Sequence, residues 1–307
     1  MKILIVGAGA TGGYFGARLA QAGQDVTFLV RPGRAEVLRK RGLRIVGPEA
    51  EEVVVPRLVT ADELDSPYDV VLLTVKATAL ERSIEDVVPA IGPGTVLVPV
   101  LNGMAHLEVL NARFGSAAVL GGVAKVVTTL NEDGDIVRLA PPAVLTVGAQ
   151  DGPAERAEEI AGVLRSAGID GSASADIVGA MWHKWVFIST VGAVTCLLRG
   201  TVGEINAVPG GTGFAAGVLA ETAAVAAAAG HPVPVAELAL IEDMVTQSGS
   251  PLVSSMYRDV VAGRPAEVEQ LLGDLVARAR ELRVATPLLD LATLHLRVHQ
   301  QRAVQGG

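Results

Sequence analysis

The sequence predicts an α/β fold for the first half of the chain and an all-helical fold for the second half. Residues 2–6 form a short apolar run that passes into a group of glycines and then into an amphipathic segment. Further apolar runs of strand length alternate with helical patterns as far as residue 175, as in proteins built on a parallel sheet. From Asp176 onward only helical patterns follow. We therefore expect two domains, over residues 1–175 and 176–307.

The glycines after the first run have the spacing Gly7-x-Gly9-x-x-Gly12. Between a strand and a helix, the first glycine makes a tight turn, the second lets a pyrophosphate approach the backbone, and the third lets the helix pack closely on the strand. The first N–H groups of the helix suit a phosphate. A helix over residues 11–22 and a second strand over residues 25–30 supply this context, so we predict a Rossmann-type dinucleotide-binding domain. The residues expected to contact the cofactor are Gly7, Ala8, Gly9, Ala10, Thr11 and Gly12. The alternative is a glycine turn in some other α/β protein.

The end of the second strand indicates which dinucleotide is bound. An Asp or Glu there would bind the ribose 2′-hydroxyl of NAD. This chain instead has Arg31 and Arg34 after an apolar strand, and a guanidinium suits a 2′-phosphate. We therefore predict NADP, with Arg31 in contact with it. The alternative is that both arginines are solvated charges at the start of a helix.

Polar residues also follow two later strands of the predicted sheet. The apolar run over residues 68–76 ends at Lys76, and the strand over residues 95–101 ends at Asn102. The carboxyl ends of strands in a doubly wound sheet face the ligand, so we expect both residues to contact the cofactor and the Asn102 amide to bind substrate as well. The alternatives are a solvated lysine and a turn asparagine before Gly103. Other elements expected here are a helix over 34–41, a hairpin over 43–46 and 53–55, and a helix over 79–91.

The pattern changes between residues 119 and 175. Short β runs over 123–130, 135–139 and 143–147 are separated by polar residues and by Pro141-Pro142. We expect these runs to be antiparallel strands added to the parallel sheet. A helix over 154–167 and a short strand close this domain.

The C-terminal half is expected to be a substrate or dimerisation domain, with the active site in the cleft between the two domains. Its predicted helices cover residues 176–198, 214–229, 235–246, 251–261, 265–283 and 287–301.

Composition excludes several classes of protein. The formal net charge of the 307-residue chain is -8 and no long basic block is present, which argues against nucleic-acid or anionic-membrane partners. The single cysteine, Cys196, allows no intramolecular disulfide and no cysteine metal cluster, and we expect it in the core. A strand starting at residue 2 leaves no room for a signal peptide, so we expect a cytoplasmic protein. The apolar stretch over 186–198 is too short to span a bilayer and that over 214–230 carries Glu221, so no transmembrane segment is expected.

Reduction of a carbonyl group by hydride needs a proton donor or a cation beside the developing alkoxide. His183 and Lys184 lie in the otherwise apolar stretch Met181 to Phe187, and we predict Lys184 to be the general acid. By residue type alone, a lysine whose stem covers apolar surface is the alternative. Ser255 lies on an early turn of the predicted helix over 251–261, and Glu267 lies in the first turn of the next predicted helix. A serine and a glutamate are ordinary residues at such positions.

Taken together, these residues resemble the ketopantoate reductases (2-dehydropantoate 2-reductases) over nearly the whole chain. The shared features are the glycine motif, Arg31, Lys76, Asn102-Gly103-Met104, Trp182-x-Lys184, Ser254-Ser255-Met256-Tyr257-x-Asp259 and Glu267. The resemblance implies a Rossmann domain followed by a helical domain, and reduction of ketopantoate to pantoate by NADPH, a step of pantothenate biosynthesis. It also implies that Lys184 protonates the C2 oxygen, that Glu267 hydrogen-bonds a substrate hydroxyl, and that Asn102 and Ser255 hold the polar end of the substrate.

One departure from the family concerns the helix after Lys184. The family usually carries two asparagines there, where this chain has Ile188 and Gly192. Hydroxyl groups of Ser189, Thr190 or Thr195 are candidates to replace part of that hydrogen bonding. A different 2-oxo acid as substrate is therefore the first alternative, since a site that cannot pair a hydroxyl discriminates poorly for it. An NADP-binding redox sensor without turnover is the second. The sequence leaves the oligomeric state open, with a homodimer through the helical domain as one option.

Overall fold

The computed structural model describes residues 1–47, 50–152 and 154–305. Its internal contacts divide the chain into two compact units. Unit 1 contains residues 1–101 and 106–177, and unit 2 contains residues 102–105 and 178–307. The short segment 102–105 thus belongs to unit 2 although it follows a strand of unit 1.

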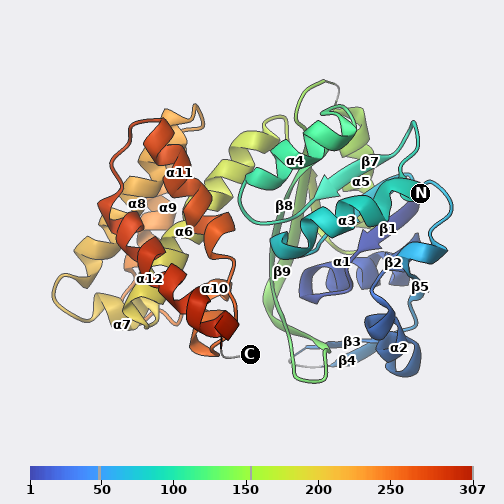
Figure 1. The fold of residues 1–307 in the computed structure, drawn as a ribbon, viewed down its shortest axis with the longest axis horizontal. Helices are drawn as coiled ribbons and strands as arrows, with labels where there is room; N and C mark the ends of the chain where they lie inside the picture. Colours follow the sequence, from blue (N-terminus) through green and yellow to red (C-terminus); the bar gives the residue numbers. More distant parts are fainter. Residues whose placement is uncertain (48–49, 153, 306–307) are drawn as a thin grey trace. The chain divides into compact units, whose positions relative to one another are not determined.

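The first sheet of unit 1 has five strands in the order β5-β2-β1-β6-β7 (Figure 1). All its neighbouring strands are parallel, which confirms the predicted α/β fold. The strand order reverses between β1 and β6, and ligands of such sheets bind at the carboxyl ends of the strands beside this reversal. The strands are β1 (Lys2–Val6), β2 (Asp25–Leu29), β5 (Arg57–Val59), β6 (Val70–Leu73) and β7 (Val96–Pro99). The sequence pattern missed β5 because three residues carry no readable alternation.

The later β runs form a second sheet, which adjoins the first only through an isolated parallel bridge between Leu97 and Val119 among the described residues. The antiparallel pairing expected of these runs is confirmed for β8 and β9, but their membership of the first sheet is not. Strand β9 pairs with β8, β10 and β3, and β3 pairs with β4 in the predicted hairpin. Strand β9 continues through the Pro141-Pro142 pair, where an irregular register with β8 accommodates residues that lack a backbone N–H. The members are β3 (Leu43–Val46), β4 (Glu51–Val54), β8 (Leu120–Leu130), β9 (Ile136–Ala149) and β10 (Asp170–Ala173).

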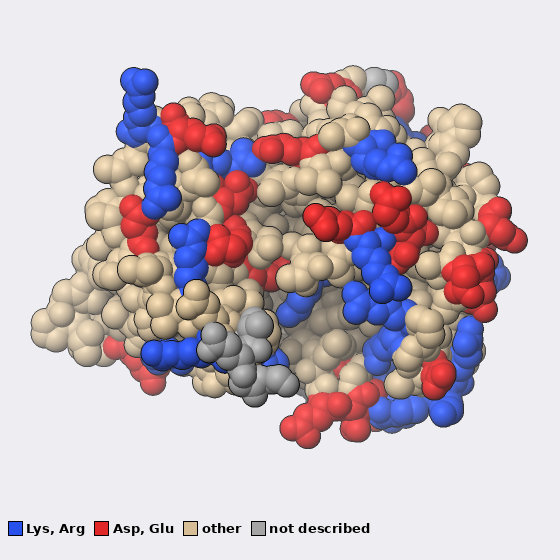
Figure 2. Space-filling view, viewed as in Figure 1, with Lys and Arg blue, Asp and Glu red and all other residues tan. Residues whose placement is uncertain are grey.

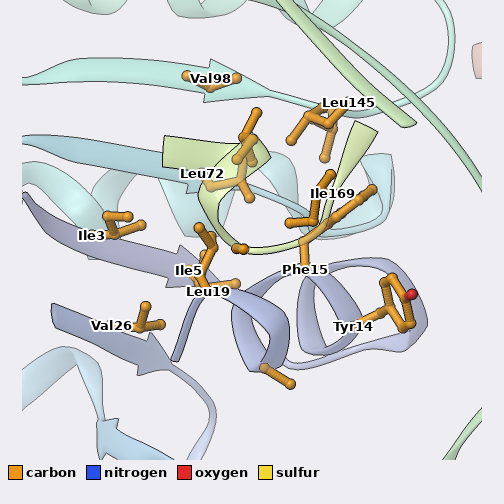
Figure 3. Packing of buried hydrophobic residues seen from close by; sticks show 14 of the residues in the cluster. Ile3, Ile5, Tyr14, Phe15, Leu19, Val26, Leu72, Val98, Leu145 and Ile169 are labelled. Atoms are coloured by element: carbon orange, nitrogen blue, oxygen red, sulfur yellow. The ribbon is translucent and has the colours of Figure 1, made fainter. Parts of the chain in front are cut away.

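Helix α1 (Ala10–Gln21) contacts both sheets of unit 1. Phe15 of this helix is fully buried, and Figure 3 shows it in one apolar cluster with Ile5 of the first sheet and Leu145 of the second. The approach to the first sheet is close, because a Cβ placed on Gly16 would lie 2.5 Å from the Phe28 ring. The other helices of this part are α2 (Pro32–Arg41), α3 (Leu80–Val87), α4 (Ala105–Phe114) and α5 (Glu155–Ser166), with short 3-10 turns at Ala61–Glu63, Ala77–Ala79 and Val88–Ala90.

A hydrogen-bonded charge pair joins α1 to β4. Arg18 Nη1 and Nη2 donate to the two carboxylate oxygens of Glu52 at 2.6 and 2.9 Å, and Gln21 Nε2 donates to Oε2 at 2.8 Å. The Arg18 hydrogen bonds, followed by that of Gln21, hold the pKa of Glu52 below its ordinary range. Because both side chains are partly exposed, we expect the pair to contribute only about 0.5–1 kcal/mol to folding.

This pair predicts a pH dependence of stability. A carboxyl group whose folded pKa is lowered stabilises the fold fully above its unfolded pKa, about 4.3, and that contribution is lost as the pH falls through the folded pKa. The difference in unfolding free energy between the wild type and Glu52→Gln should therefore shrink by about 0.5–1 kcal/mol between neutral pH and about pH 3. Urea unfolding of both proteins at both pH values measures it. A difference that is the same at both pH values contradicts this assignment.

Unit 2 is helical, and no strand occurs among its described residues, 102–105 and 178–305. Its helices are α6 (Ile177–Leu198), α7 (Val202–Asn206), α8 (Gly211–Ala228), α9 (Val235–Thr246), α10 (Ser255–Val261), α11 (Asp274–Glu281) and α12 (Pro287–Gln305), and a π-helix, η4 (Glu269–Gly273), precedes α11. The all-helical prediction is confirmed, although α7 and the π-helix were not anticipated. Each has only five residues, too few for helical periodicity in the sequence to distinguish it from a loop or from a neighbouring α-helix.

Helices α6 and α8 are long and apolar enough to cross a membrane by length and composition, which is weak evidence because a core helix passes the same test. In α6, 67% of the most apolar window is buried inside the protein, and in α8 the share is 39%. Glu221 of α8 accepts hydrogen bonds from the N–H groups of Leu288 and Leu289 at 3.0 and 2.9 Å. The one acidic residue that interrupts this alanine-rich helix therefore caps the first turn of α12.

Candidate functional site

The glycine-rich turn lies at the switch point of the first sheet. Gly7 has φ +94°, a conformation that favours glycine. Thr74, which follows β6, places its hydroxyl oxygen 2.7 Å from the Val6 carbonyl oxygen and 2.9 Å from that of Gly7. A Cβ on Gly12 would lie 2.0 Å from Thr74 Oγ1 and 2.4 Å from the Gly7 carbonyl oxygen. Gly12 therefore lets α1 start in direct contact with the ends of β1 and β6.

Gly9 has a different environment from its two neighbours in the motif. It is the N-cap of α1 and has no side chain to accept from the first-turn N–H groups, and that turn carries no acidic residue. Apart from Gly9 itself and its neighbours along the chain, no described heavy atom would lie within 4 Å of a Cβ built on Gly9. A helix start with uncapped donors beside open space fits a pyrophosphate group, which would bind through the first-turn N–H groups.

The two arginines after β2 have different roles. Arg31 is the exposed N-cap of α2. Arg34 Nη2 donates to the carbonyl oxygens of Gly134 at 2.8 Å and Ala8 at 3.3 Å, and burial lowers its pKa. Arg34 thus ties the glycine-rich turn to the loop between β8 and β9, so the expectation that both guanidiniums address a 2′-phosphate is revised to Arg31. Figure 2 shows Lys and Arg side chains gathered over the region of α2, with Asp and Glu side chains among them, in a chain of net charge -8.

Lys76 and Asn102 lie beyond the strands that the sequence pattern assigned to them. Strand β6 ends at Leu73, and Lys76 is an exposed residue at the start of the 3-10 turn Ala77–Ala79. Strand β7 ends at Pro99, and the half-buried Asn102 belongs to unit 2.

The segment that carries Asn102 packs on two helices of unit 2. Gly103 has φ +79°, and a Cβ on it would lie 2.4 Å from the Gln270 carbonyl oxygen and 4.0 Å from Trp185 Nε1. Gln270 is three residues from Glu267, and Trp185 follows Lys184. The backbone at Gly103 therefore brings together the segments that carry Asn102, Lys184 and Glu267, which lie far apart in the sequence.

The π-helix η4 is bonded to α6. The Leu271 carbonyl oxygen accepts from Trp185 Nε1 at 2.9 Å and from Ser189 Oγ at 3.2 Å. π-helices are rare and frequent at functional sites. Glu267 is half-buried and lies two residues before this element. Its carbonyl oxygen accepts from the Leu271 N–H at 3.1 Å, so it stands immediately before the helical turn in which it was expected.

The hydroxyl groups that follow Lys184 on α6 are already engaged. Ser189 donates to Leu271 as above, Thr190 Oγ1 donates to Val186 at 2.8 Å, and Thr195 Oγ1 donates to Val191 at 2.6 Å. All three residues are fully buried. The expectation that they replace missing amide groups toward a substrate is therefore not supported. Lys184 itself is half-buried on the same helix.

Helix α10 places Ser255 and Met256 differently. Ser255 is the exposed first residue of the helix, after Ser254, whose Oγ accepts from the Tyr257 N–H at 2.9 Å as the N-cap. Met256 is buried and points to α6, since a Cβ on Gly192 would lie 2.8 Å from its terminal methyl carbon. Methionine therefore fills the space beside Gly192.

Two further predictions can be compared with the structure. Cys196 is fully buried, as expected, and burial raises the pKa of its thiol to about 11, so it is an unreactive core residue. Among the described residues, no group of three or more His, Cys, Asp or Glu side chains is arranged to hold a metal ion.

Comparisons with known proteins place both halves of the chain in the same family. The family model described as ketopantoate reductase PanE/ApbA matches residues 3–152, and the model of its C-terminal domain matches residues 176–300. An uncharacterized oxidoreductase of Bacillus subtilis (strain 168), YkpB, is 36% identical, over 98% of this chain and 99% of its own. A 2-dehydropantoate 2-reductase of Archaeoglobus fulgidus is 31% identical, over 100% of this chain and 98% of its own.

Solved structures show the same fold. The crystal structure of 2-dehydropantoate 2-reductase from Geobacter metallireducens GS-15 is similar with a TM-score of 0.88 and 28% identity, covering 97% of this chain and 99% of that one. A D-mandelate dehydrogenase solved with NADH and anilino(oxo)acetate has a TM-score of 0.90 at 23% identity, covering 99% and 100% of the two chains. At that identity the second likeness concerns the fold alone.

Proposed function

Because the chain belongs to the ketopantoate reductase family, whose members are NADP-dependent oxidoreductases, we propose that it reduces a 2-oxo acid to the 2-hydroxy acid with Lys184 as the proton donor. The observation that supports this role is the grouping of Asn102, Lys184, Ser255 and Glu267 in one unit, where the backbone around Gly103 packs on the segments beside Lys184 and Glu267. Ketopantoate is the first candidate substrate because of the relatives that reduce it.

The roles of the unit 2 residues follow from the charge that develops in the reaction. When C2 accepts a hydride, its oxygen becomes an alkoxide, and the Lys184 ammonium group stabilises that charge and transfers a proton to it. The lysine then takes a proton from solvent, which restores it for the next turnover. Glu267 accepts a hydrogen bond from the hydroxyl group of the substrate or product, and Asn102 and Ser255 bind the carboxylate.

The roles of the unit 1 residues concern cofactor binding. NADPH, when bound, supplies the hydride. The first-turn N–H groups of α1, at Ala10, Thr11 and Gly12, bind its pyrophosphate, with Gly9 leaving room for it. Arg31 binds the 2′-phosphate, and Lys76 adds a cation at the end of β6.

The proposal is tested by the initial rate of NADPH oxidation by the purified protein, with ketopantoate beside a panel of other 2-oxo acids and an NADH control. Turnover of at least one 2-oxo acid with NADPH is expected. If NADPH binds but no 2-oxo acid is reduced, the proposal fails and the redox-sensor alternative gains support.

Arg31→Ala is expected to raise KM for NADPH by about tenfold or more, because a hydrogen bond between charged groups contributes about 1.5–3 kcal/mol. KM for NADH should stay within about twofold, since NADH has no 2′-phosphate. Arg39→Ala, which removes another exposed arginine of α2, is the matched control. Equal changes in the two KM values for Arg31→Ala, or an equal effect of Arg39→Ala, would argue that Arg31 acts only through the general charge of the helix.

The setting of the reaction is part of the same proposal. If ketopantoate is the substrate, the product is pantoate and the step belongs to pantothenate biosynthesis. We propose a cytoplasmic enzyme that acts without nucleic-acid or membrane partners and that forms a homodimer through its helical unit.

A further inference from the structure

We propose that the enzyme recognises the side chain of its 2-oxo acid as an apolar group, and that a hydroxyl group on that side chain is not a recognition element. This inference rests on the reduction by Lys184 proposed above and concerns the substrate of that same site.

The first observation is the helical surface around Lys184. Residues three and four positions apart lie on one face of an α-helix, so the neighbours of Lys184 on α6 are Ala180, Met181, Phe187 and Ile188. All four are apolar, and Ala180, Phe187 and Ile188 are only half-buried. A substrate whose C2 oxygen meets the lysine therefore meets carbon atoms on either side of it along this helix.

The second observation is the engagement of every hydroxyl group on the following turns of α6. Ser189, Thr190 and Thr195 are fully buried and each lies within hydrogen-bond distance of a backbone carbonyl oxygen, at 3.2, 2.8 and 2.6 Å. Because all three side chains are 0% exposed, a substrate could reach one of these hydroxyl groups only if the packing of the helix rearranged. These groups are therefore part of the helix packing.

The third observation is the packing at Gly192, two turns beyond Lys184 on the same face. The terminal methyl group of Met256 lies where a side chain at position 192 would extend, 2.8 Å from the ideal Cβ position. Met256 is 3% exposed, so it is held in this place by its surroundings. Position 192 is thus buried and filled by a thioether side chain, and it offers no polar group.

The consequence for specificity follows from hydrogen-bond energetics. A site built to pair a substrate hydroxyl rejects the analogue without it by about 10⁴–10⁵, whereas an apolar site discriminates an added hydroxyl by only about 10² or less. In this inference Glu267, which the family resemblance assigns to a substrate hydroxyl, accepts instead from the hydroxyl group that reduction forms at C2. A second hydroxyl on the side chain has no partner on α6.

The test uses two acids that differ by one hydroxyl group, ketopantoate (4-hydroxy-3,3-dimethyl-2-oxobutanoate) and 3,3-dimethyl-2-oxobutanoate. With NADPH, kcat/KM for the acid without the hydroxyl should be at least about one tenth of kcat/KM for ketopantoate. A preference for ketopantoate beyond about tenfold overturns the inference while leaving the proposed reduction intact. If the enzyme reduces neither of these acids and no other 2-oxo acid, both this inference and the proposed reduction are overturned.

Two variants make the test specific to this surface. Ile188→Asn adds an amide group one turn from Lys184 and should shift the ratio of the two kcat/KM values toward ketopantoate by about tenfold, the effect of one hydrogen bond. Ile188→Leu keeps the surface apolar and should leave the ratio within about twofold of the wild type. Thermal unfolding of both variants checks that they fold. A ratio that is the same in the folded Ile188→Asn variant and the wild type contradicts a role of this surface in recognition.

Discussion

Lys184→Ala is expected to lower kcat for the 2-oxo acid by about 10²–10⁴, the range that a positioned acid or base contributes to proton transfer. The reason is the composition of α6, where the residues three and four positions from Lys184, its neighbours on the same face of the helix, are apolar and carry no proton donor. NADPH affinity, measured by fluorescence titration, should remain within about twofold of the wild type if Lys184 acts only on the substrate.

Two companion variants separate proton transfer from charge. Lys184→Arg keeps the positive charge but replaces an ammonium group, which can give up its proton, by a guanidinium that stays protonated, so it should recover little of the lost kcat. His183→Gln changes the adjacent residue, whose Nδ1 lies 3.0 Å from Glu237 Oε2, and should leave kcat within about threefold. If Lys184→Ala keeps the turnover of the wild type, the proposed mechanism is wrong.

The second large effect is expected at the glycine-rich turn. Gly12→Ala should reduce the free energy of unfolding by about 3 kcal/mol or more, because its Cβ would overlap Thr74 Oγ1 and the Gly7 carbonyl oxygen at 2.0 and 2.4 Å. The Gly7 oxygen belongs to the backbone and cannot turn away, so α1 would have to move off the sheet. Urea unfolding of the variant and the wild type measures the loss.

Gly9→Ala is the matched variant for cofactor binding. Beyond its neighbours along the chain, no described heavy atom lies within 4 Å of its ideal Cβ, and its φ of -84° is accessible to alanine, so stability should change by no more than about 0.5 kcal/mol. The added methyl group would stand where the pyrophosphate approaches the backbone, and NADPH affinity should fall about tenfold or more. Unchanged NADPH affinity in a stable Gly9→Ala protein would place the pyrophosphate elsewhere.

The sequence alone was sufficient for the local features of the fold. The apolar run before Gly7, the spacing of the three glycines and the helical periodicity after them predicted strand, turn and helix, because each depends on neighbours within a few residues. Helix α9 was predicted with its observed bounds, Val235–Thr246, for the same reason. The absence of an acidic residue after β2, and the presence of Arg31 there, could also be read directly.

The tertiary structure decided what depends on residues distant in the sequence. The second sheet is formed by strands from residues 43–54, 120–149 and 170–173, and no local pattern states which strands pair. The same limit explains why Arg34 was taken for a phosphate ligand, since its acceptor at Gly134 is 100 residues away. The same holds for η4, whose Leu271 carbonyl oxygen accepts from Trp185 and Ser189, 86 and 82 residues away in the sequence.

The residue types of the candidate site could therefore be predicted from the sequence. Which of its polar groups are free to bind a substrate could not. Lys184, Ile188 and Gly192 lie at helical spacing on one face, which the sequence shows. That the intervening hydroxyl groups donate to backbone carbonyls, and that Met256 from another helix fills the space at Gly192, follows only from packing between helices. A side chain's residue type determines which hydrogen bonds it can make, and the fold determines which of them it has already made.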